Sequence, residues 1–221
     1  MCKTGAMTAA RPLPAVLTGR WVRLEPLTAD LLPELHRAIA VPEVFAGGYG
    51  GGPAGLREDL FGFTEWARTY YRWNELPFAV RRIGGNSDGA IVGTSSLADL
   101  DPGTESAQLG WTAYAPSVWG TAVNAETKLL LLGHAFASGI GRITIQADSR
   151  NERSRAAILG IGAVFEGIRR RDRRRADGSW RDTAVYSVLS EEWPQVRALL
   201  EHRVEGVAAP AGRGAAKMTR E

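Results

Sequence analysis

The segment that most constrains the fold runs from residue 105 to residue 137 and reads ESAQLGWTAYAPSVWGTAVNAETKLLLLGHAFA. A strand-like stretch comes first, a loop with Pro116 and Gly120 follows, and an apolar helical pattern covers residues 124–137. A strand that feeds a loop at a helix N-terminus leaves several backbone N–H groups unpaired and pointing in one direction. Such a segment is suited to hold a phosphate or pyrophosphate group.

Hydrophobic periodicity predicts further elements on both sides of this segment. Before it, we predict strands over residues 20–27, 78–82 and 90–100, helices over 31–39 and 56–73, and a glycine-rich loop over 47–55. After it, we predict strands over 142–147, 164–175 and 183–189, and helices over 152–159 and 191–203. The glycine-rich loop follows a helix, so we interpret it as a connector or substrate-site flap and not as a phosphate loop. The order of elements predicts a mixed α/β fold.

Length and composition favour one globular domain with short extensions. We predict a flexible N-terminal arm over residues 1–17, a single domain over 18–204 and a disordered C-terminal tail over 205–221. No apolar run approaches the roughly 18 residues of a membrane helix, and the first residues do not resemble a secretory signal. Cys2 is the only cysteine, which excludes an internal disulfide and a cysteine metal cluster. These observations favour a cytoplasmic protein without a membrane partner.

Several short motifs follow one another along the predicted domain. They are Leu109-Gly110-Trp111 at a strand end, Pro116, the loop WGTAVNAE at residues 119–126, NERS at 151–154, and GAVFEG at 162–167. Their order and spacing resemble those of the GNAT superfamily of N-acetyltransferases, in particular the group that acetylates the N-termini of ribosomal proteins. The resemblance covers residues 20–203. It implies the α/β (α+β) GNAT fold, with a mixed, mostly antiparallel sheet of six to seven strands flanked by helices.

The resemblance implies an N-acetyltransferase that uses acetyl-CoA and no metal. Backbone groups of Thr112 and Tyr114 would pair with the pantetheine amides, Asn151 would hydrogen-bond the pantetheine arm, and Ser154 would lie near the thioester sulfur. The CoA pyrophosphate would face the backbone N–H groups of the loop and helix start, which are Trp119, Gly120, Thr121, Ala122, Val123 and Asn124. Ala122 stands where the family loop has a second glycine, and alanine suits this position if its dihedrals are helical.

Transfer from a thioester to an amine requires a deprotonated amine, a stabilised carbonyl oxygen and a protonated leaving thiolate. Relatives often carry a glutamate where this chain has Gln108, which can orient the amine or a water but cannot act as a base. Glu105 is the alternative base, and water could also remove the proton. Relatives often place a tyrosine at Ile158, so Ser154 becomes the candidate donor to the thiolate, with a helix-capping role as the alternative.

The acceptor implied by the resemblance is a primary amine, either a protein or peptide N-terminus or a small molecule. No cysteine is placed to carry the acetyl group, so we expect direct attack in a ternary complex. Two alternatives stay open: a non-catalytic acyl-CoA-binding or sensor protein, which Gln108, Ile158 and Ala122 favour, and a transferase of another acyl group such as succinyl. Relatives often pair, so a homodimer is also considered.

Six arginines lie within residues 169–175, although the net charge of the chain is only +3. In a strand their side chains would alternate between the two faces of the sheet. One face could reach the acceptor entrance, the CoA 3′-phosphate or an acidic acyl group. The alternative is a solvated edge strand whose charges discourage aggregation. Nucleic acid is not the expected partner, because no recognition motif accompanies the arginines.

Overall fold

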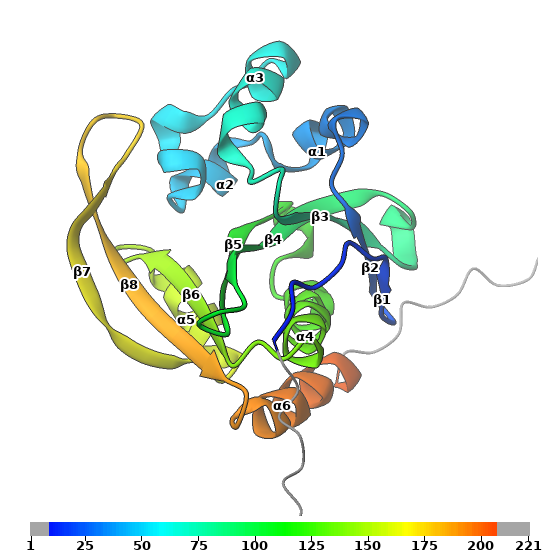
Figure 1. Cartoon of the computed structure of the whole chain (residues 1–221). Coiled ribbons are helices and arrows are strands. Elements are labelled where there is room, and N and C mark those ends of the chain that lie inside the picture. The colour runs from blue at the N-terminus through cyan, green and yellow to red at the C-terminus, as the bar shows by residue number, and fades with distance from the viewer. Residues whose placement is uncertain (1–8, 207–221) are drawn as a thin grey trace, which may run out of the picture.

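The computed structural model describes residues 9–206, which form an eight-stranded sheet with helices on both faces (Figure 1). The strands are β1 (Leu17–Thr18), β2 (Val22–Pro26), β3 (Leu76–Arg82), β4 (Ile91–Asp101), β5 (Ser106–Tyr114), β6 (Arg142–Asp148), β7 (Val164–Arg174) and β8 (Trp180–Leu189). Their order in the sheet is β1-β2-β3-β4-β5-β6-β8-β7, and every neighbouring pair is antiparallel except β5 and β6. The predicted mixed, mostly antiparallel α/β fold is therefore confirmed.

The sheet has one strand more than the sequence patterns predict. All seven predicted strands are present, and β1 is the eighth, with two residues paired to β2. Two residues are too few to produce a detectable alternation of apolar and polar side chains. The short helix α2 (Pro42–Ala46) was also not predicted, because its five residues form little more than one helical turn.

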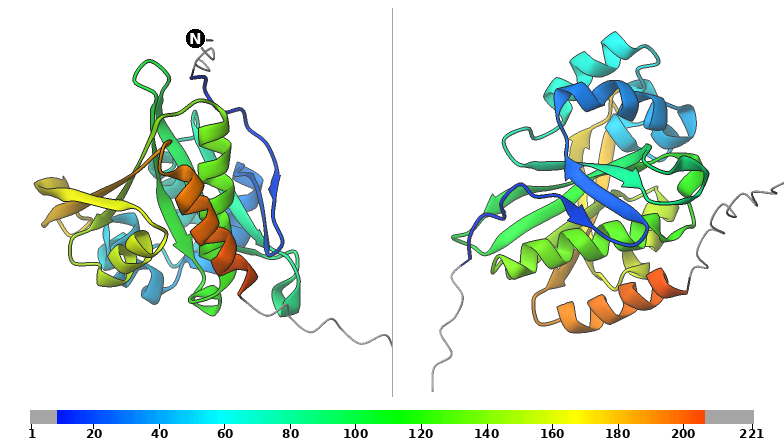
Figure 2. Two further views of the ribbon diagram at one scale, coloured as in Figure 1. Left: turned by 90° about the horizontal axis from the view of Figure 1, so that it is seen from below. Right: turned by 90° about the vertical axis from the view of Figure 1, so that its right-hand side faces the viewer.

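Helices cover the two faces of the sheet. They are α1 (Leu32–Ile39), α2, α3 (Leu60–Tyr70), α4 (Ala122–Ala137), α5 (Glu152–Gly160) and α6 (Trp193–Glu205). The first three lie over one face, while α4 and α6 lie side by side against the other (Figures 1 and 2). Each face has its own hydrophobic core, one around α1 and α3 and one around α4 and α6. Residues 91–98 of β4 are buried throughout, since the middle of the sheet is covered on both sides.

A buried carboxylate connects α4 to the first strands of the sheet. Glu126 is 3% exposed and accepts hydrogen bonds from the backbone N–H groups of Arg20, Trp21 and Val22 at 2.7, 2.6 and 2.8 Å. Gly19 makes this close approach sterically feasible, because a Cβ atom there would lie 2.3 Å from the Glu126 Cδ. The helix that follows the predicted phosphate loop is thus held by residues about 100 positions earlier in the chain.

Residues 9–16 contain no helix or strand, but they contact the domain. The backbone N–H of Ala10 donates to the Ser138 carbonyl at 2.9 Å, and Arg11 pairs with Glu75 at 2.6 Å. Residues 1–8 of the predicted arm and residues 207–221 of the predicted tail lie outside the described residues. The division into arm, domain and tail therefore stays a prediction. Within residues 9–206, no helix has both the length and the apolar character needed to cross a membrane.

Candidate active site

The two parallel strands of the sheet separate halfway along their length. β5 and β6 pair from Ser106–Arg142 to Leu109–Ile145 and no further. At this point β5 contains a bulge, in which Trp111 and Thr112 lie opposite the single residue Ser95 of β4, and Trp111 has a left-handed φ of +50°. Bulges bend a strand and increase its twist. The second half of β5 therefore follows β4 away from β6 and leaves a gap in the sheet.

A cavity of about 300 Å³ occupies this gap. Its walls are residues 109–114 of β5, 145–148 of β6, the loop residues 118–120, and parts of α4 and α5. This volume lies at the lower end of the range for ligand pockets. The cavity extends from the point where the strands separate to the N-terminus of α4, so a long, narrow ligand could contact both.

The loop before α4 has the geometry of an anion site. Gly120 has a φ of +72°, which favours glycine, and the Thr121 hydroxyl accepts from the Val123 N–H at 3.3 Å while it donates to the Val118 carbonyl at 2.7 Å. α4 begins at Ala122, so this residue has the helical dihedrals with which an alanine can occupy the position of the family's second glycine. Ala122 and Val123 turn their side chains into the core, while Gly120 and Asn124 line the cavity.

Trp119 joins the loop to both sides of the cavity. Its indole N–H donates to the Tyr114 carbonyl at 2.9 Å, and the Arg153 guanidinium lies 3.6 Å from its ring centroid. Arg153 also lines the cavity near the N-terminus of α4. A positive side chain therefore adds to the partial positive charge of the helix end.

Asn151 and Ser154 lie together at the start of α5. The Asn151 side-chain oxygen caps the helix by accepting from the Ser154 N–H at 2.9 Å, and its amide group donates to the Gly47 carbonyl. Both ends of this side chain are therefore used within the protein. Because Asn151 is the cap, Ser154 does not fill that role, and its hydroxyl has no hydrogen-bond partner within residues 9–206. Ser154 lines the cavity, as does Ile158 one turn later.

Gln108, the candidate to orient the amine, and Glu105, the candidate base, lie in different places. Gln108 is 8% exposed, and its side-chain oxygen accepts from the Gln146 amide at 2.8 Å, while Gln146 accepts from Arg173 at 3.0 Å. Glu105 precedes β5, and its backbone carbonyl accepts from the N–H groups of Gly141 and Arg142. Glu105 lines neither cavity and is about 16 Å from Gly110 along the strand. We therefore do not assign it a part in the chemistry.

A second cavity of about 380 Å³ adjoins the first at the separated strands. Gly48, Tyr70, Gly110, Trp111, Gln146 and Arg181 line both cavities. Its other walls are the glycine-rich loop and the tip of the β7–β8 hairpin, including Arg173, Arg174 and Arg175, and its lining contains no carboxylate. In residues 9–206, no group of three or more potential metal ligands is arranged around a common point.

The acetyltransferase (GNAT) domain family matches residues 22–164. The chain belongs to this family. A curated relative, "Putative ribosomal N-acetyltransferase YdaF" from Bacillus subtilis (strain 168), is 33% identical over 131 residues, which cover 58% of this chain and 67% of that protein. Its name supports the predicted likeness of this GNAT acetyltransferase to the ribosomal-protein group, and the prediction of an acyltransferase enzyme is confirmed.

Solved structures agree with this placement. A GCN5-related N-acetyltransferase from Brucella melitensis has a TM-score of 0.79 at 26% identity, covering 90% of this chain and 89% of that one. Mycobacterium smegmatis RimJ, solved in complex with CoA-disulfide, has a TM-score of 0.69 at 22% identity and covers 86% of this chain and 94% of that one. The second likeness concerns the fold alone.

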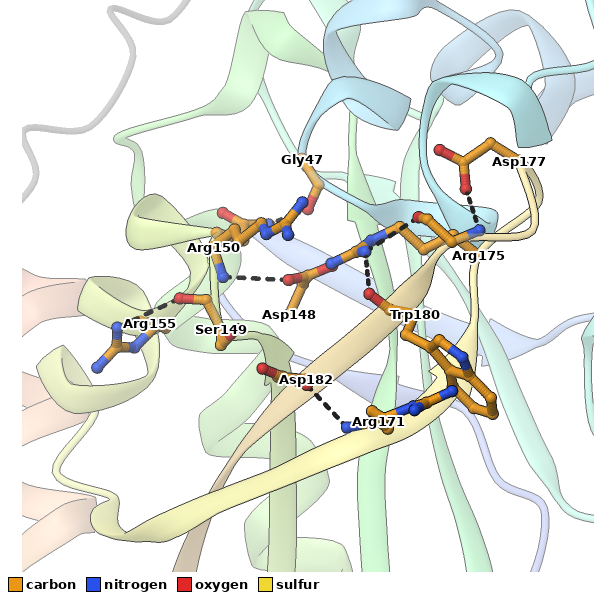
Figure 3. A network of polar contacts seen from close by, with 12 residues as sticks. Gly47, Asp148, Ser149, Arg150, Arg155, Arg171, Arg175, Asp177, Trp180 and Asp182 are labelled. Carbon is orange, nitrogen blue, oxygen red and sulfur yellow. Dashed lines mark hydrogen bonds and ion pairs between the residues drawn. The ribbon is translucent and has the colours of Figure 1, made fainter.

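An ion pair holds the hairpin of this GNAT acetyltransferase over the second cavity (Figure 3). Asp148, at the end of β6, accepts from the Nε and Nη2 groups of Arg175 at 2.9 and 2.7 Å and from the backbone N–H of Arg150 at 3.1 Å. The neighbouring Ala176 N–H donates to the Gly51 carbonyl at 3.0 Å. The glycine-rich loop, the hairpin tip and β6 are therefore connected around the same cavity, as the interpretation of residues 47–55 as a substrate-site flap requires.

Arg175→Met is expected to lower the free energy of unfolding by about 3 kcal/mol, because it leaves a buried carboxylate without its partner. The side chains of Arg175 and Asp148 are 11% and 8% exposed, so solvent compensates little for the loss. Urea denaturation measures the change, and faster amide exchange at Ala176 would show that the hairpin tip has loosened. Arg170→Met, an exposed change on the same strand, is the control; equal losses in both variants would contradict a role for the ion pair.

The six arginines of residues 169–175 are divided between the two environments predicted for them, which are a solvated edge strand and the entrance for a substrate or cofactor. Arg169, Arg170 and Arg171 lie on the edge strand β7, are exposed and line neither cavity, whereas Arg173, Arg174 and Arg175 line the second cavity, although Arg173 and Arg174 are also exposed to solvent. A bulge causes the division, because the β7–β8 register shifts between Arg169 and Arg173 and Arg171 has a φ of +50°. Strict strand alternation could not predict this.

A buried lysine is the main site residue that the sequence did not single out. Lys128 lies on α4, is 5% exposed, lines the first cavity and donates to the hydroxyls of Thr112 at 2.7 Å and Ser95 at 3.1 Å. Burial lowers the pKa of its amine to about 7. A signal was present, since position 128 lies three residues after Ala125 and four before Leu132, on the stripe predicted to be buried.

Proposed function

We propose that this GNAT acetyltransferase transfers an acetyl group from acetyl-CoA to a primary amine by direct attack in a ternary complex. The observation that carries the proposal is the meeting of two cavities where β5 and β6 separate. One cavity reaches the N-terminus of α4 and suits the cofactor. The other lies under the hairpin and suits the acceptor, so thioester and amine can approach each other from opposite sides.

On the cofactor side, the unpaired half of β5 would receive the pantetheine arm, and the start of α4 would receive the pyrophosphate. Thr112 is the better placed of the two strand residues, because the Tyr114 carbonyl is already bonded to the Trp119 indole. Arg153 would add a positive charge near the phosphates. Asn151 lines the cofactor cavity and would position Ser154 and the glycine-rich loop, while the second N–H and the second lone pair of its amide remain available to the pantetheine arm. The complex of the structurally similar RimJ with CoA-disulfide supports a CoA ligand in this fold.

On the acceptor side, the chemistry does not require a dedicated base. Arginines line this cavity and carboxylates do not, so a bound ammonium would be disfavoured and the pKa of the amine lowered. A peptide α-amine has a pKa of about 8 in water and would be largely neutral in such a site. Burial raises the pKa of the nearby Tyr70 to about 12, so this phenol does not serve as a base near neutral pH.

In the proposed step the amine nitrogen attacks the thioester carbonyl carbon, the C–N bond forms and the C–S bond breaks. The surplus amine proton passes to water. Ser154 would hydrogen-bond the leaving thiolate, since its hydroxyl is otherwise free and lines the cavity. Gln108 is held by Gln146 and would orient the amine or a water. The acceptor is either a peptide N-terminus, which the name of the Bacillus relative favours, or a small-molecule amine.

The test is release of free CoA thiol from acetyl-CoA in the presence of peptides with free or formylated N-termini and of simple amines. Release is expected only with free amines, and Ser154→Ala is expected to lower kcat about tenfold at an unchanged KM for acetyl-CoA. Ser190→Ala, on the exposed turn after β8, is the matched control. Absence of thiol release across the panel, with acetyl-CoA bound, would overturn the proposal.

A further inference from the structure

We propose that the second cavity binds a carboxylate carried by one of the two substrates, with Arg181 and Arg173 as the binding residues. This inference rests on the proposed function, because it names the chemistry of a group that lies beside the reacting amine and thioester. The carboxylate belongs either to the acyl group, as in succinyl-CoA, or to the acceptor.

The first observation is a guanidinium without a partner. Arg181 lies on β8 and borders both cavities. Its Nε is buried without a hydrogen-bond acceptor, and its guanidinium makes no ion pair with any side chain of residues 9–206. Burying a charged group without a partner costs free energy. The other arginines at this end of the hairpin have partners, which makes Arg181 the exception among them.

The second observation is the position of Arg173. It lies directly opposite Arg181 in the β7–β8 register, and like charges in such cross-strand positions destabilise a sheet. Burial, and to a smaller extent Arg173, lowers the pKa of Arg181. The nearby carboxylates are held by other arginines, since Asp148 is bound by Arg175 and Asp172 lies 3.3 Å from both Arg169 and Arg173, so within residues 9–206 Arg181 alone of this cross-strand pair lacks an anionic partner. An anion bound to Arg181 would supply that partner and offset the repulsion from Arg173 across the strands.

The chemistry of the site favours a carboxylate on a substrate. A guanidinium presents a planar set of N–H donors that matches the two oxygens of a carboxylate. Because Arg181 borders both cavities, a group bound to it would lie next to the junction where thioester and amine meet. The neutral pair Gln108 and Gln146 forms the adjacent wall, and Gln146 fixes Arg173 by a hydrogen bond of 3.0 Å. The site is therefore built for a negative group of small size.

The test measures dissociation constants by isothermal titration calorimetry for the wild-type protein, Arg181→Met and Arg170→Met. The acyl arm compares acetyl-CoA with succinyl-CoA, whose acyl chain ends in a carboxylate. The acceptor arm uses the CoA-loaded protein and compares alanyl-glutamate amide with alanyl-glutamine amide, which differ only in the carboxylate. Arg170→Met removes the same charge from an exposed position that lines neither cavity.

Arg181→Met is expected to weaken binding of the carboxylate-bearing probe at least about tenfold in one arm, with less than about threefold change for its neutral partner. The arm that responds identifies the source of the carboxylate. The melting temperature of Arg181→Met should equal or exceed that of the wild type, since an unpaired buried charge is removed. If this variant does not fold, Arg181→Lys serves instead, because it keeps the charge and loses the planar fork.

If Arg181→Met and Arg170→Met had equal dissociation constants for each of the four probes, the carboxylate site would be overturned. Thiol release separates this outcome from failure of the proposed function. Release of thiol without any dependence of binding on Arg181 leaves acetyl transfer standing and removes the carboxylate site. Binding that depends on Arg181, without thiol release from any pair of substrates, supports the site and contradicts the transfer reaction.

Discussion

Lys128→Met is expected to abolish a pH dependence of about 5 kcal/mol in the free energy of unfolding. Burial lowers the pKa of Lys128 from 10.5 to about 7, a difference of about 3.5 units, and each unit corresponds to about 1.4 kcal/mol. Between these two pH values the unfolded chain binds a proton that the folded chain does not, so stability rises with pH across the window. Below pH 7 both states are protonated, and the full cost of the buried charge is present.

The measurement is urea denaturation of the wild type and Lys128→Met at intervals from about pH 6 to about pH 11, which spans both pKa values. Lys128 is the only lysine within residues 9–206, so no other lysine of this part of the chain contributes to the difference. The two hydroxyls that it contacts remain satisfied in the variant, because Ser95 and Thr112 are also bonded to each other at 2.8 Å. Stability curves that run parallel over this pH range would contradict the assignment.

Glu126→Ala is expected to lower the free energy of unfolding by about 4 kcal/mol, because three backbone N–H groups, those of Trp21 and Val22 in buried hydrogen bonds and that of Arg20 in a partly buried one, lose their acceptor. Glu126→Gln keeps the shape and one acceptor oxygen, so about half of that loss is expected. Denaturation at pH 7 measures both changes. The control is Glu201→Ala, which removes a carboxylate from an exposed pair with Arg197 on α6 and should change stability by less than about 1 kcal/mol. If Glu126→Ala were no more destabilising than the control, the connection between α4 and β2 would be energetically unimportant.

Much of the fold could be predicted because its elements are long and strongly patterned. The start of α4 differed by two residues from the prediction, since Ala122 and Val123 precede the periodic stripe but already have helical backbone. β1 and α2 could not be predicted, because two and five residues carry no period. Sequence motifs also indicated the loop and Ser154, since local spacing determines where they lie.

The remainder of the site depends on contacts between distant segments. Asn151 lines the first cavity, and its contact with the cofactor stays a prediction, but no motif indicates that its amide also contacts Gly47, more than 100 residues earlier. Gln108 and Gln146 meet only because β5 and β6 are neighbours, and the sequence gives no sign of their pairing. Arg181 resembles any other strand arginine until the folded hairpin shows that the acids around it are already paired. Whether Arg181 has a partner therefore depends on where all the neighbouring acids and arginines lie in the folded protein.

The single parallel ladder of the sheet has a mechanical consequence. Strands β1–β5 and β6–β8 form two antiparallel halves, and only four residue pairs between β5 and β6 join them within the sheet. Beyond these four pairs the two strands no longer pair, and the halves are joined through the hydrophobic core packed against α4 and α6. A ligand that hydrogen-bonds the unpaired parts of both β5 and β6 would take the place of a ninth strand between them for as long as it is bound. Binding and release of this ligand would then change the stiffness of the whole sheet in every catalytic cycle.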